Sequence, residues 1–373
     1  FFRLWRKNTS MSTKADAAKK AAEKEAQSWG AEPTGGPIPV TILTGFLGAG
    51  KTTLLNRILR ENHGEKIAVI ENEFGEEGVD NEILADTKEQ IVEMNNGCIC
   101  CTVRGDLIRI LNSLYKRRAR GEFNFTRVII ETTGMADPAP VAQTFFADEK
   151  VNERYLLDAV VTVVDAKHGL TQLKDFSEAQ QQVAFADRLL VSKTDVTAEE
   201  ETQKLMERLR KLNVRAPIKK VNFGETPIQD LLDIRGFNLN AILEIQPDFL
   251  TSDDHEHHDE VHSFVIKSEK PLDVRKVDRY IGSLINLYGE QMLRYKGILY
   301  IKGEPRRVVF QGVHMMAGFD FASEWPDDAK KESTIVFIGR KLPEPLFREL
   351  FEDCIATDET PDDPKAYAQG TAT

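Results

Sequence analysis

Apolar and polar positions along this chain of 373 residues follow two different periodicities. Between Pro37 and about Arg235, short apolar runs rich in β-branched residues are separated by stretches in which apolar residues recur at helical spacing. The apolar runs are Val40–Thr44, Ile67–Ile70, Val128–Ile130, Ala159–Val164, Arg188–Val191 and Ile218–Val221. The helical stretches include Leu107–Arg118, Pro138–Phe146 and Thr197–Leu212. Buried strands that alternate with helices predict an α/β fold, with a mainly parallel sheet covered by helices on both faces.

The pattern changes after Asp253–Glu260, a polar run without periodicity. Phe264 and Ile266 then alternate with polar residues, as in a half-buried strand. The remaining expected elements are a helix with Val274, Val277, Ile281, Leu284 and Leu287 on one face, strands at Ile298–Ile301, Arg307–Val313 and Thr334–Ile338, and a closing helix that carries Leu346, Phe347, Leu350, Phe351, Cys354 and Ile355. This order predicts a second, smaller α+β domain, with Cys354 in its core rather than acting as a ligand.

Composition narrows the class of protein. The net charge of −11 argues against a nucleic-acid partner held through phosphate contacts. No apolar run approaches the roughly 20 residues that a membrane span needs. Three of the four cysteines lie at positions 98, 100 and 101, which indicates metal or redox chemistry in a reducing compartment. We therefore expect a cytoplasmic protein, and the basic, aromatic Phe1–Ser10 leaves import into an organelle open as the alternative.

The stretch Gly45–Thr52 fits the phosphate-binding spacing G-x-x-x-x-G-K-[ST], between an expected strand and an expected helix. Such a turn aims backbone N–H groups and the helix dipole at one point, which suits a triphosphate. Lys51 would reach the β- and γ-phosphates, and the Thr52 hydroxyl would ligate Mg²⁺. The residues expected to contact the nucleotide here are Gly45, Phe46, Leu47, Gly48, Ala49, Gly50, Lys51, Thr52 and Thr53.

Two further motifs end expected strands. In Glu131-Thr-Thr-Gly134, the carboxylate can hold Mg²⁺ through water and the Gly134 N–H can approach a γ-phosphate; a plain strand-to-helix turn is the alternative. Lys51, Thr52 and Glu131 are thus the expected catalytic residues.

The second of these motifs, Ser192-Lys193-Thr194-Asp195, resembles the N-K-x-D guanine-reading motif, with serine in place of asparagine. The Asp195 carboxylate can accept hydrogen bonds from N1–H and from the 2-amino group of guanine, a donor pair that adenine lacks. We therefore expect GTP to be bound in preference to ATP. An ordinary strand-end loop with a capping aspartate is the alternative.

The cysteines belong to Gly97-Cys98-Ile-Cys100-Cys101, and soft thiolates of this kind suit Zn²⁺, Co²⁺ or Cu(I). Glu71 and Glu76 follow the strand Ile67–Ile70 and offer carboxylates at the same edge of the sheet. The alternative is a set of reactive or structural thiols without metal. The imidazoles of His255, His257 and His258 lie among acids, and this run is either a solvated linker or a weak metal-capture segment.

Taken together, these motifs resemble the CobW-type P-loop GTPases, relatives of the nickel-handling GTPases. The matching residues are Gly45–Thr53, Glu71–Glu76, Cys98–Cys101, Glu131–Pro138, Ser192–Asp195, Gln311–His314 and Val336–Arg340. The resemblance implies a metallochaperone that binds a divalent ion, often zinc, and delivers it to a client metalloprotein in a GTP-dependent way. It places the metal ligands on Glu71, Glu76 and Cys100, with Cys98 and Cys101 alongside.

Within that family the chain is similar to the eukaryotic zinc-regulated GTPase activators that load zinc into methionine aminopeptidase. Those proteins carry a Cys-Pro-Glu-Leu-Val-type docking motif ahead of the P-loop, whereas Ala31–Pro37 occupies that region here. The alternatives are a regulatory GTPase with a structural zinc and a cobalt-insertion helper for cobalamin synthesis, since Zn²⁺ and Co²⁺ accept similar sites. The chain is expected to be a monomer or a dimer.

The expected domain organisation is a disordered tail over residues 1–36, a P-loop GTPase domain over 37–240, an acidic, His-rich linker over 241–261, a CobW C-terminal-like domain over 262–357 and a disordered tail over 358–373.

Overall fold

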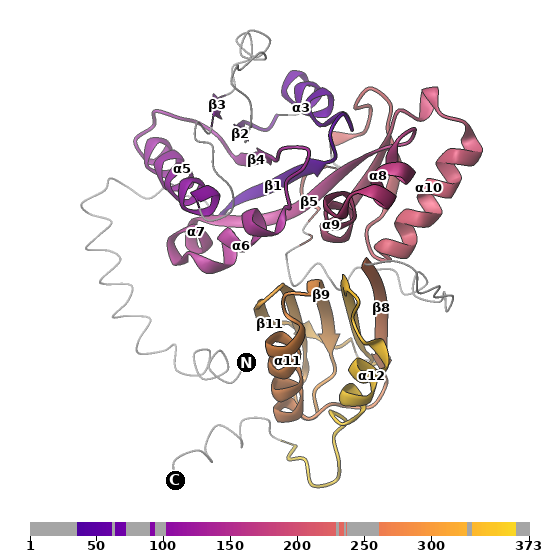
Figure 1. The fold of residues 1–373 in the computed structure, drawn as a ribbon. Coiled ribbons are helices and arrows are strands. Elements are labelled where there is room, and N and C mark those ends of the chain that lie inside the picture. Colours follow the sequence, from indigo (N-terminus) through magenta and orange to yellow (C-terminus); the bar gives the residue numbers. More distant parts are fainter. Residues whose placement is uncertain are drawn as a thin grey trace. The chain divides into compact units, whose positions relative to one another are not determined.

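The computed structural model describes residues 36–61, 64–71, 90–93, 102–228, 231–234, 236, 261–326 and 330–362. These residues belong to two compact units, one within Pro33–Asn238 and the other within Leu239–Thr373, and each is described by itself below (Figure 1).

The first unit is built on a seven-stranded sheet whose strand order is β3-β2-β4-β1-β5-β6-β7. Every pairing in it is parallel. The strands are β1 (Ile38–Gly45), β2 (Ile67–Glu71), β3 (Gln90–Glu93), β4 (Arg127–Glu131), β5 (Tyr155–Asp165), β6 (Arg188–Ser192) and β7 (Ile218–Lys220). Neighbouring residues that point to opposite faces, such as Ile129 and Ile130 of β4, are both buried. The predicted parallel sheet covered on both faces is thereby confirmed.

The helices of the first unit connect successive strands. They are α3 (Lys51–Arg60), α5 (Thr102–Ala119), α6 (Ala139–Ala147), α7 (Glu149–Arg154), α8 (Gly169–Asp175), α9 (Ser177–Phe185) and α10 (Glu199–Leu212), with the short 3₁₀ helix η1 (Thr194–Val196). The hydrophobic pattern did not predict α8 and α9. The reason is visible in α9, where Gln180, Gln181 and Gln182 are buried and so interrupt the apolar periodicity.

The second unit contains a five-stranded antiparallel sheet with the order β11-β10-β9-β12-β8. Its elements are β8 (Val261–Ser268), α11 (Val274–Tyr288), β9 (Met292–Leu299), β10 (Arg306–Val313), β11 (Met316–Glu324), β12 (Ser333–Arg340) and α12 (Glu344–Glu352). The predicted order lacks β11. This edge strand is half-exposed for most of its length, and the tight turn at His314 and Met315 joins it to β10. The strand also contains no Val, Ile or Thr, the β-branched residues that are typical of strands.

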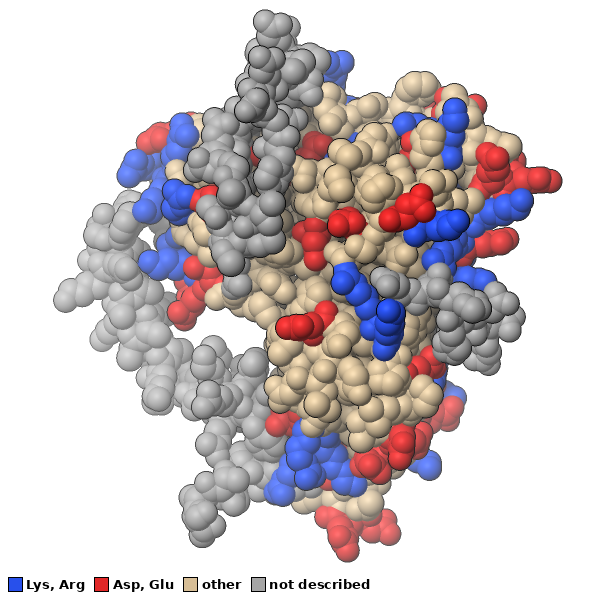
Figure 2. Space-filling model, in the orientation of Figure 1, with Lys and Arg blue, Asp and Glu red and all other residues tan. Residues whose placement is uncertain are grey.

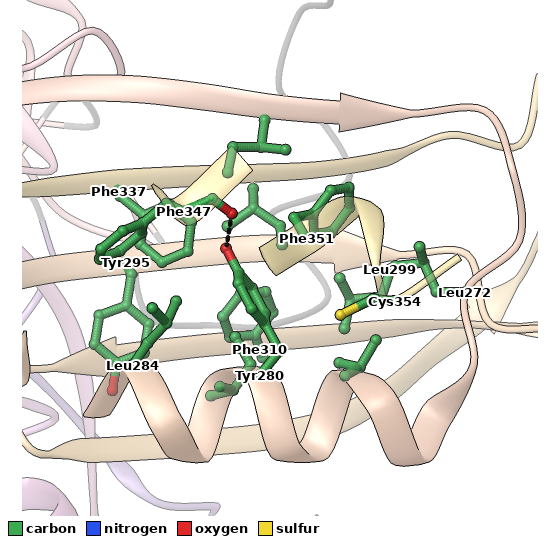
Figure 3. Close-up of a cluster of buried hydrophobic side chains, with 14 of the residues drawn as sticks. Leu272, Tyr280, Leu284, Tyr295, Leu299, Phe310, Phe337, Phe347, Phe351 and Cys354 are labelled. Carbon is green, nitrogen blue, oxygen red and sulfur yellow. Dashed lines mark hydrogen bonds between the residues drawn. The ribbon is translucent and has the colours of Figure 1, made fainter. Parts of the chain in front are cut away.

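The core of the second unit lies between its helices and one face of this sheet (Figure 3). The rings of Phe337 and Phe347 meet edge to face, with centroids 5.0 Å apart. The buried Tyr280 hydroxyl donates a hydrogen bond to the Phe347 carbonyl across 3.1 Å. Cys354 is buried in the same cluster, and burial raises the pKa of its thiol to about 12. The placement of Cys354 in the core is therefore as predicted.

Three further details of the second unit differ from the prediction. The strand expected at Ile298–Ile301 is β9 over Met292–Leu299, and Ile301 forms only an isolated bridge with Leu272. Leu287 is 66% exposed, because the buried face of α11 continues through Tyr288, which packs against the core instead. Thr360 falls in the expected C-terminal tail but is buried, and its hydroxyl donates to Asp273 Oδ2 across 3.1 Å. Asp273 is also the N-cap of α11, so residues as far as 362 belong with this unit, and 363–373 lie outside the described residues.

Charges of both signs are present on the face of the described residues that Figure 2 draws. On the face drawn in Figure 2, basic and acidic side chains lie interspersed rather than in one continuous patch of either sign. Among the helices that the structure describes, none combines the length and the apolar character needed to cross a bilayer.

Candidate nucleotide site

The phosphate-binding motif forms the loop between β1 and α3, at the carboxyl edge of the parallel sheet. Helix α3 begins at Lys51, as predicted, and Gly50 immediately before it has φ of 100°. That left-handed conformation is accessible to glycine but strained for other residues, so the turn from strand to helix depends on it. The loop thus presents the N-terminus of a ten-residue helix, where backbone N–H groups and the helix dipole favour an anion.

Lys51 lies over its own loop. Its Nζ donates to the Gly45 carbonyl across 2.9 Å, and the residue is only 9% exposed. Burial lowers the pKa of the Lys51 ammonium below its usual value, and the negative charge of Glu131 offsets part of that shift. A phosphate bound in this loop would add negative charge beside the buried ammonium and so favour its charged form.

Thr52 and Glu131 bring two oxygen atoms together beside the loop. The Thr52 hydroxyl donates to Glu131 Oε1 across 3.3 Å, although the two residues are 79 positions apart in the sequence. A hydroxyl and a carboxylate are the oxygen donors that Mg²⁺ prefers, and the ion characteristically takes one or two protein ligands together with phosphate and water. The donor set therefore fits a magnesium ion.

The loop that follows β4 is attached to the phosphate-binding strand. The Thr132 N–H donates to the Leu43 carbonyl across 3.0 Å, which extends the pairing of β4 with β1 beyond the strand end. The Thr132 hydroxyl donates to the Thr44 hydroxyl across 2.8 Å, and both residues are buried. The backbone leading to Gly134 is thus fixed to the strand that carries the phosphate-binding loop.

Gly134 itself packs directly against that loop. A Cβ atom added to it would lie 2.7 Å from the Cα of Leu47, closer than real contacts allow. On its other side, the Gln182 side-chain amide donates to the carbonyls of Gly134 (3.1 Å) and Ala136 (3.0 Å). Gly134 is therefore held between the phosphate-binding loop and α9. Gln182 could not be identified from the sequence, because nothing there shows that its helix packs against this loop.

Ser192, which stands where the motif that this loop resembles has asparagine, supports the loop Ser192–Asp195. The Ser192 hydroxyl donates to the Ala49 carbonyl across 2.7 Å, so this loop is joined to the phosphate-binding loop. Lys193, at φ of 57°, places its Nζ 2.7 Å from Asp165 Oδ2. Asp195 is exposed within η1, so its carboxylate is accessible to a ligand.

Two residues that the motifs did not include hold this loop in place. The buried Asp165 carboxylate accepts from the Lys167 N–H (2.8 Å) and the His168 N–H (3.2 Å), in addition to Lys193. Asn222 Oδ1 accepts from both the N–H (3.1 Å) and the hydroxyl (2.8 Å) of Thr194. Asp165 could have been noticed as an acidic residue that ends a long apolar strand, whereas Asn222 carries no such signal.

One of the expected zinc ligands, Glu71, is described. Glu71 ends β2 and is the register partner of Glu131 on β4. Side chains alternate along a strand, so both carboxylates share the sheet face of Val69 and Ile129, whose side chains pack in one cluster with Leu54 of α3. Glu71 and Glu131 thus belong to the same face of neighbouring strands, which in sheets lie about 4.8 Å apart.

The other expected metal ligands, Glu76, Cys98, Cys100 and Cys101, lie outside the described residues, as do His255, His257 and His258. Within the part of the chain that the structure does describe, no group of three or more His, Cys, Asp and Glu residues could hold a metal ion.

Two family models match the chain. Residues 39–220 match the model of the CobW/HypB/UreG nucleotide-binding domain, and residues 261–355 match the cobalamin synthesis protein cobW C-terminal domain. Zinc chaperone YjiA of Escherichia coli (strain K12) is 46% identical over 316 residues, which cover 84% of this chain and 98% of that protein.

A second relative is zinc-regulated GTPase metalloprotein activator 1 of Saccharomyces cerevisiae, 30% identical over 359 residues, with 84% of this chain and 82% of that protein covered. Among solved structures, the crystal structure of the Zn(II)-bound YjiA GTPase from E. coli superposes with a TM-score of 0.70 at 40% identity. It covers 86% of this chain and 99% of that one. The phosphate-binding loop, the guanine-type loop and both family matches lead to one conclusion: the chain belongs to the CobW/HypB/UreG family and carries the cobW C-terminal domain.

Proposed function

We propose that this protein is a GTP-hydrolysing metallochaperone that binds zinc as cargo and transfers it to a client metalloprotein in a GTP-dependent way. The names of its relatives, a zinc chaperone and a zinc-regulated GTPase metalloprotein activator, support that class of activity. The proposed cargo ligands are those of the sequence analysis: Glu71, Glu76, Cys98, Cys100 and Cys101. The proposed division into a GTPase domain and a C-terminal domain follows the boundaries given there, except that the C-terminal domain extends to residue 362.

The observation that carries the proposal is the register of Glu71 with Glu131. Glu131 contacts Thr52 at the start of α3, where γ-phosphate and Mg²⁺ would bind. Glu71 is the proposed cargo ligand on the neighbouring strand. A ligand that changes the position or charge of Glu131 must therefore act on the environment of Glu71. By linkage, nucleotide and zinc then change each other's affinity by the same factor.

On the nucleotide side, each residue has a separate proposed role. Lys51 and the loop N–H groups bind the phosphates, and Thr52 and Glu131 hold Mg²⁺, which when bound neutralises charge on the β- and γ-phosphates. The Gly134 N–H orients the γ-phosphate. Asp195 selects guanine, because its carboxylate can accept hydrogen bonds from N1–H and the 2-amino group of guanine. Adenine offers no such donor pair.

The test measures zinc affinity of the full-length protein, by competition with a chromogenic chelator, in the presence of GDP and of a non-hydrolysable GTP analogue. We expect the two affinities to differ by about five-fold or more, the usual size of a coupling between two sites. The Lys51→Ala variant, which loses a phosphate contact, serves as the control and should show no difference. Equal zinc affinity in both nucleotide states of the wild type would contradict the proposal and leave a GTPase with a structural zinc.

The second part of the test follows delivery. Zinc-loaded protein is mixed with apo-methionine aminopeptidase, and the recovery of peptidase activity is compared between GTP and GDP. Faster recovery with GTP supports this client. Recovery that is independent of nucleotide indicates passive exchange and contradicts GTP-dependent transfer to that enzyme.

A further inference from the structure

An aromatic residue occupies an unfavourable backbone position in the turn after β7. The Glu225 N–H donates to the Asn222 carbonyl across 2.7 Å, which closes a four-residue turn. Its two central residues, Phe223 and Gly224, have φ of 51° and 74°. Two consecutive positive φ angles are typical of turns that favour Asn, Asp and Gly. A bulky residue at the first of these positions is an outlier that costs conformational energy.

Burial does not explain the phenylalanine. Phe223 is 74% exposed, the highest value among the large apolar side chains that the structure describes. A side chain that is exposed and sits in a strained backbone conformation contributes little to folding. Strain of this kind, where the surroundings enforce it, is concentrated at sites that bind ligands.

The turn is fixed to both halves of the nucleotide site. Asn222 accepts two hydrogen bonds from Thr194, the residue directly before Asp195 in the guanine-type loop. Gly224 packs against the first turn of α3, where a Cβ added to it would lie 3.1 Å from the Cα of Leu54. Phe223 thus lies between Asn222, which contacts the loop of the proposed base site, and Gly224, which contacts α3.

We propose that the Phe223 ring stacks on the purine of the bound nucleotide and contributes to nucleotide affinity without selecting the base. This inference rests on the proposed binding of GTP. Stacking on an aromatic ring is favourable for every base because every base has a π-face, whereas the hydrogen bonds to Asp195 depend on the donors of guanine. The two residues therefore have separate roles, because Phe223 adds affinity for any purine and Asp195 sets the preference for guanine.

The test uses Phe223→Asn in the full-length protein, because asparagine suits a positive φ angle and should keep the turn or stabilise it. We expect the melting temperature to be unchanged or raised, and the affinities for GDP and ADP, measured by calorimetry, each to fall by about ten-fold. The ratio of the two affinities should stay the same. Phe223→Trp should keep wild-type affinity for GDP, and its emission should be quenched when GDP is added. Leu287→Asn, which removes an exposed apolar side chain from the other unit, should leave GDP affinity unchanged.

The outcomes separate this inference from the proposed function. If the wild type binds GDP and Phe223→Asn binds it equally well, Phe223 does not stack, and the metallochaperone proposal is unaffected. Phe223→Trp emission that ignores added GDP would overturn the inference in the same way, even if the asparagine variant failed to fold. If the wild type binds no guanine nucleotide, the proposed function fails, and the inference fails with it.

Discussion

Glu71 and Glu131 are register partners at the carboxyl ends of neighbouring parallel strands, and their side chains belong to the sheet face that packs against α3. One carboxylate is within hydrogen-bond distance of the Thr52 hydroxyl at the start of that helix. The other is a proposed zinc ligand on the adjacent strand. Because the two strands are adjacent, a change at the proposed nucleotide site can reach the proposed zinc site through these two carboxylates.

Replacement of Glu131 tests this coupling between nucleotide and zinc. Glu131→Gln keeps the shape of the side chain but removes the charge that would hold Mg²⁺ and that lies near Lys51. We expect GTP hydrolysis to fall by about a hundred-fold or more, the usual cost of removing one electrostatic contact to a transition state. Zinc affinity should then no longer differ between GDP and the GTP analogue. Phosphate release and chelator competition measure the two effects.

A matched control is Glu122→Gln, which removes an exposed carboxylate that pairs with Arg117 in the same unit. It should leave both the hydrolysis rate and the nucleotide effect on zinc unchanged. The assignment of Glu131 would be wrong if its glutamine variant hydrolysed GTP at the wild-type rate.

Gly134 gives a steric prediction. In Gly134→Ala the new methyl group meets the backbone of Leu47, which cannot give way as a side chain would. We expect a loss of about 1–3 kcal/mol in the free energy of unfolding, measured with urea, and a lower hydrolysis rate because the Gly134 N–H is displaced.

The control for this variant is Gly105→Ala in α5, where an added Cβ meets nothing within 4 Å. Alanine is the better helix former by about 1 kcal/mol, so this variant should be equally stable or more stable than the wild type. Equal stability of the Gly134 and Gly105 variants would contradict the tight contact at Leu47.

The buried ammonium of Lys51 predicts a dependence on pH. Its pKa in the folded protein lies below the unfolded value, so between the two values the unfolded chain binds more protons. The stability of the wild type relative to Lys51→Met should therefore rise with pH through that window, and the methionine variant should gain most stability at the lower pH. Urea unfolding at a series of pH values measures this difference.

Nucleotide binding should reverse the shift, because phosphate favours the charged form of Lys51. Binding of GDP at alkaline pH is then accompanied by proton uptake, which calorimetry detects as a heat that varies with the ionisation enthalpy of the buffer. In Lys51→Arg the side chain stays protonated at all accessible pH values, so the uptake should disappear. Uptake of the same size in the arginine variant would assign the proton to another group.

The cysteines give the fourth prediction. Cys100→Ser should lose tight zinc binding and keep GDP affinity, because a hydroxyl is a much poorer zinc ligand than a thiolate. Cys354→Ala should keep both, because the Cys354 thiol is buried in the core of the second unit and its raised pKa keeps it protonated at neutral pH. Zinc content measured after dialysis distinguishes the two. Loss of zinc only from the Cys354 variant would contradict the ligand assignment.

Motifs that depend on local sequence could be predicted well. The loop before Lys51 and the parallel sheet follow from alternating strands and helices with glycines at fixed spacing, and the structure confirms both. The residues that brace the site could not be predicted in the same way. The Gln182 side-chain amide donates to the carbonyls of Gly134 and Ala136, which are 48 and 46 positions away in the sequence. These contacts therefore depend on tertiary packing.

Ser192 is a second residue whose role could not be predicted from the sequence. The sequence shows only that an expected asparagine is missing, and the structure shows that the shorter side chain still reaches the Ala49 carbonyl. The edge strand β11 differs from the prediction for another reason, because it is half-exposed, follows a two-residue turn and contains no β-branched residue.

The buried carboxylate of Asp165 has a consequence for the order of events when a nucleotide arrives. It accepts hydrogen bonds from Lys193 and from the backbone N–H groups of residues 167 and 168, so contacts within the protein hold the loop that carries the proposed base site. The proposed binding of guanine to this loop should therefore cost little ordering entropy. In the proposed function, GTP and GDP are then distinguished at the phosphate end of the nucleotide, beside the proposed zinc ligand Glu71.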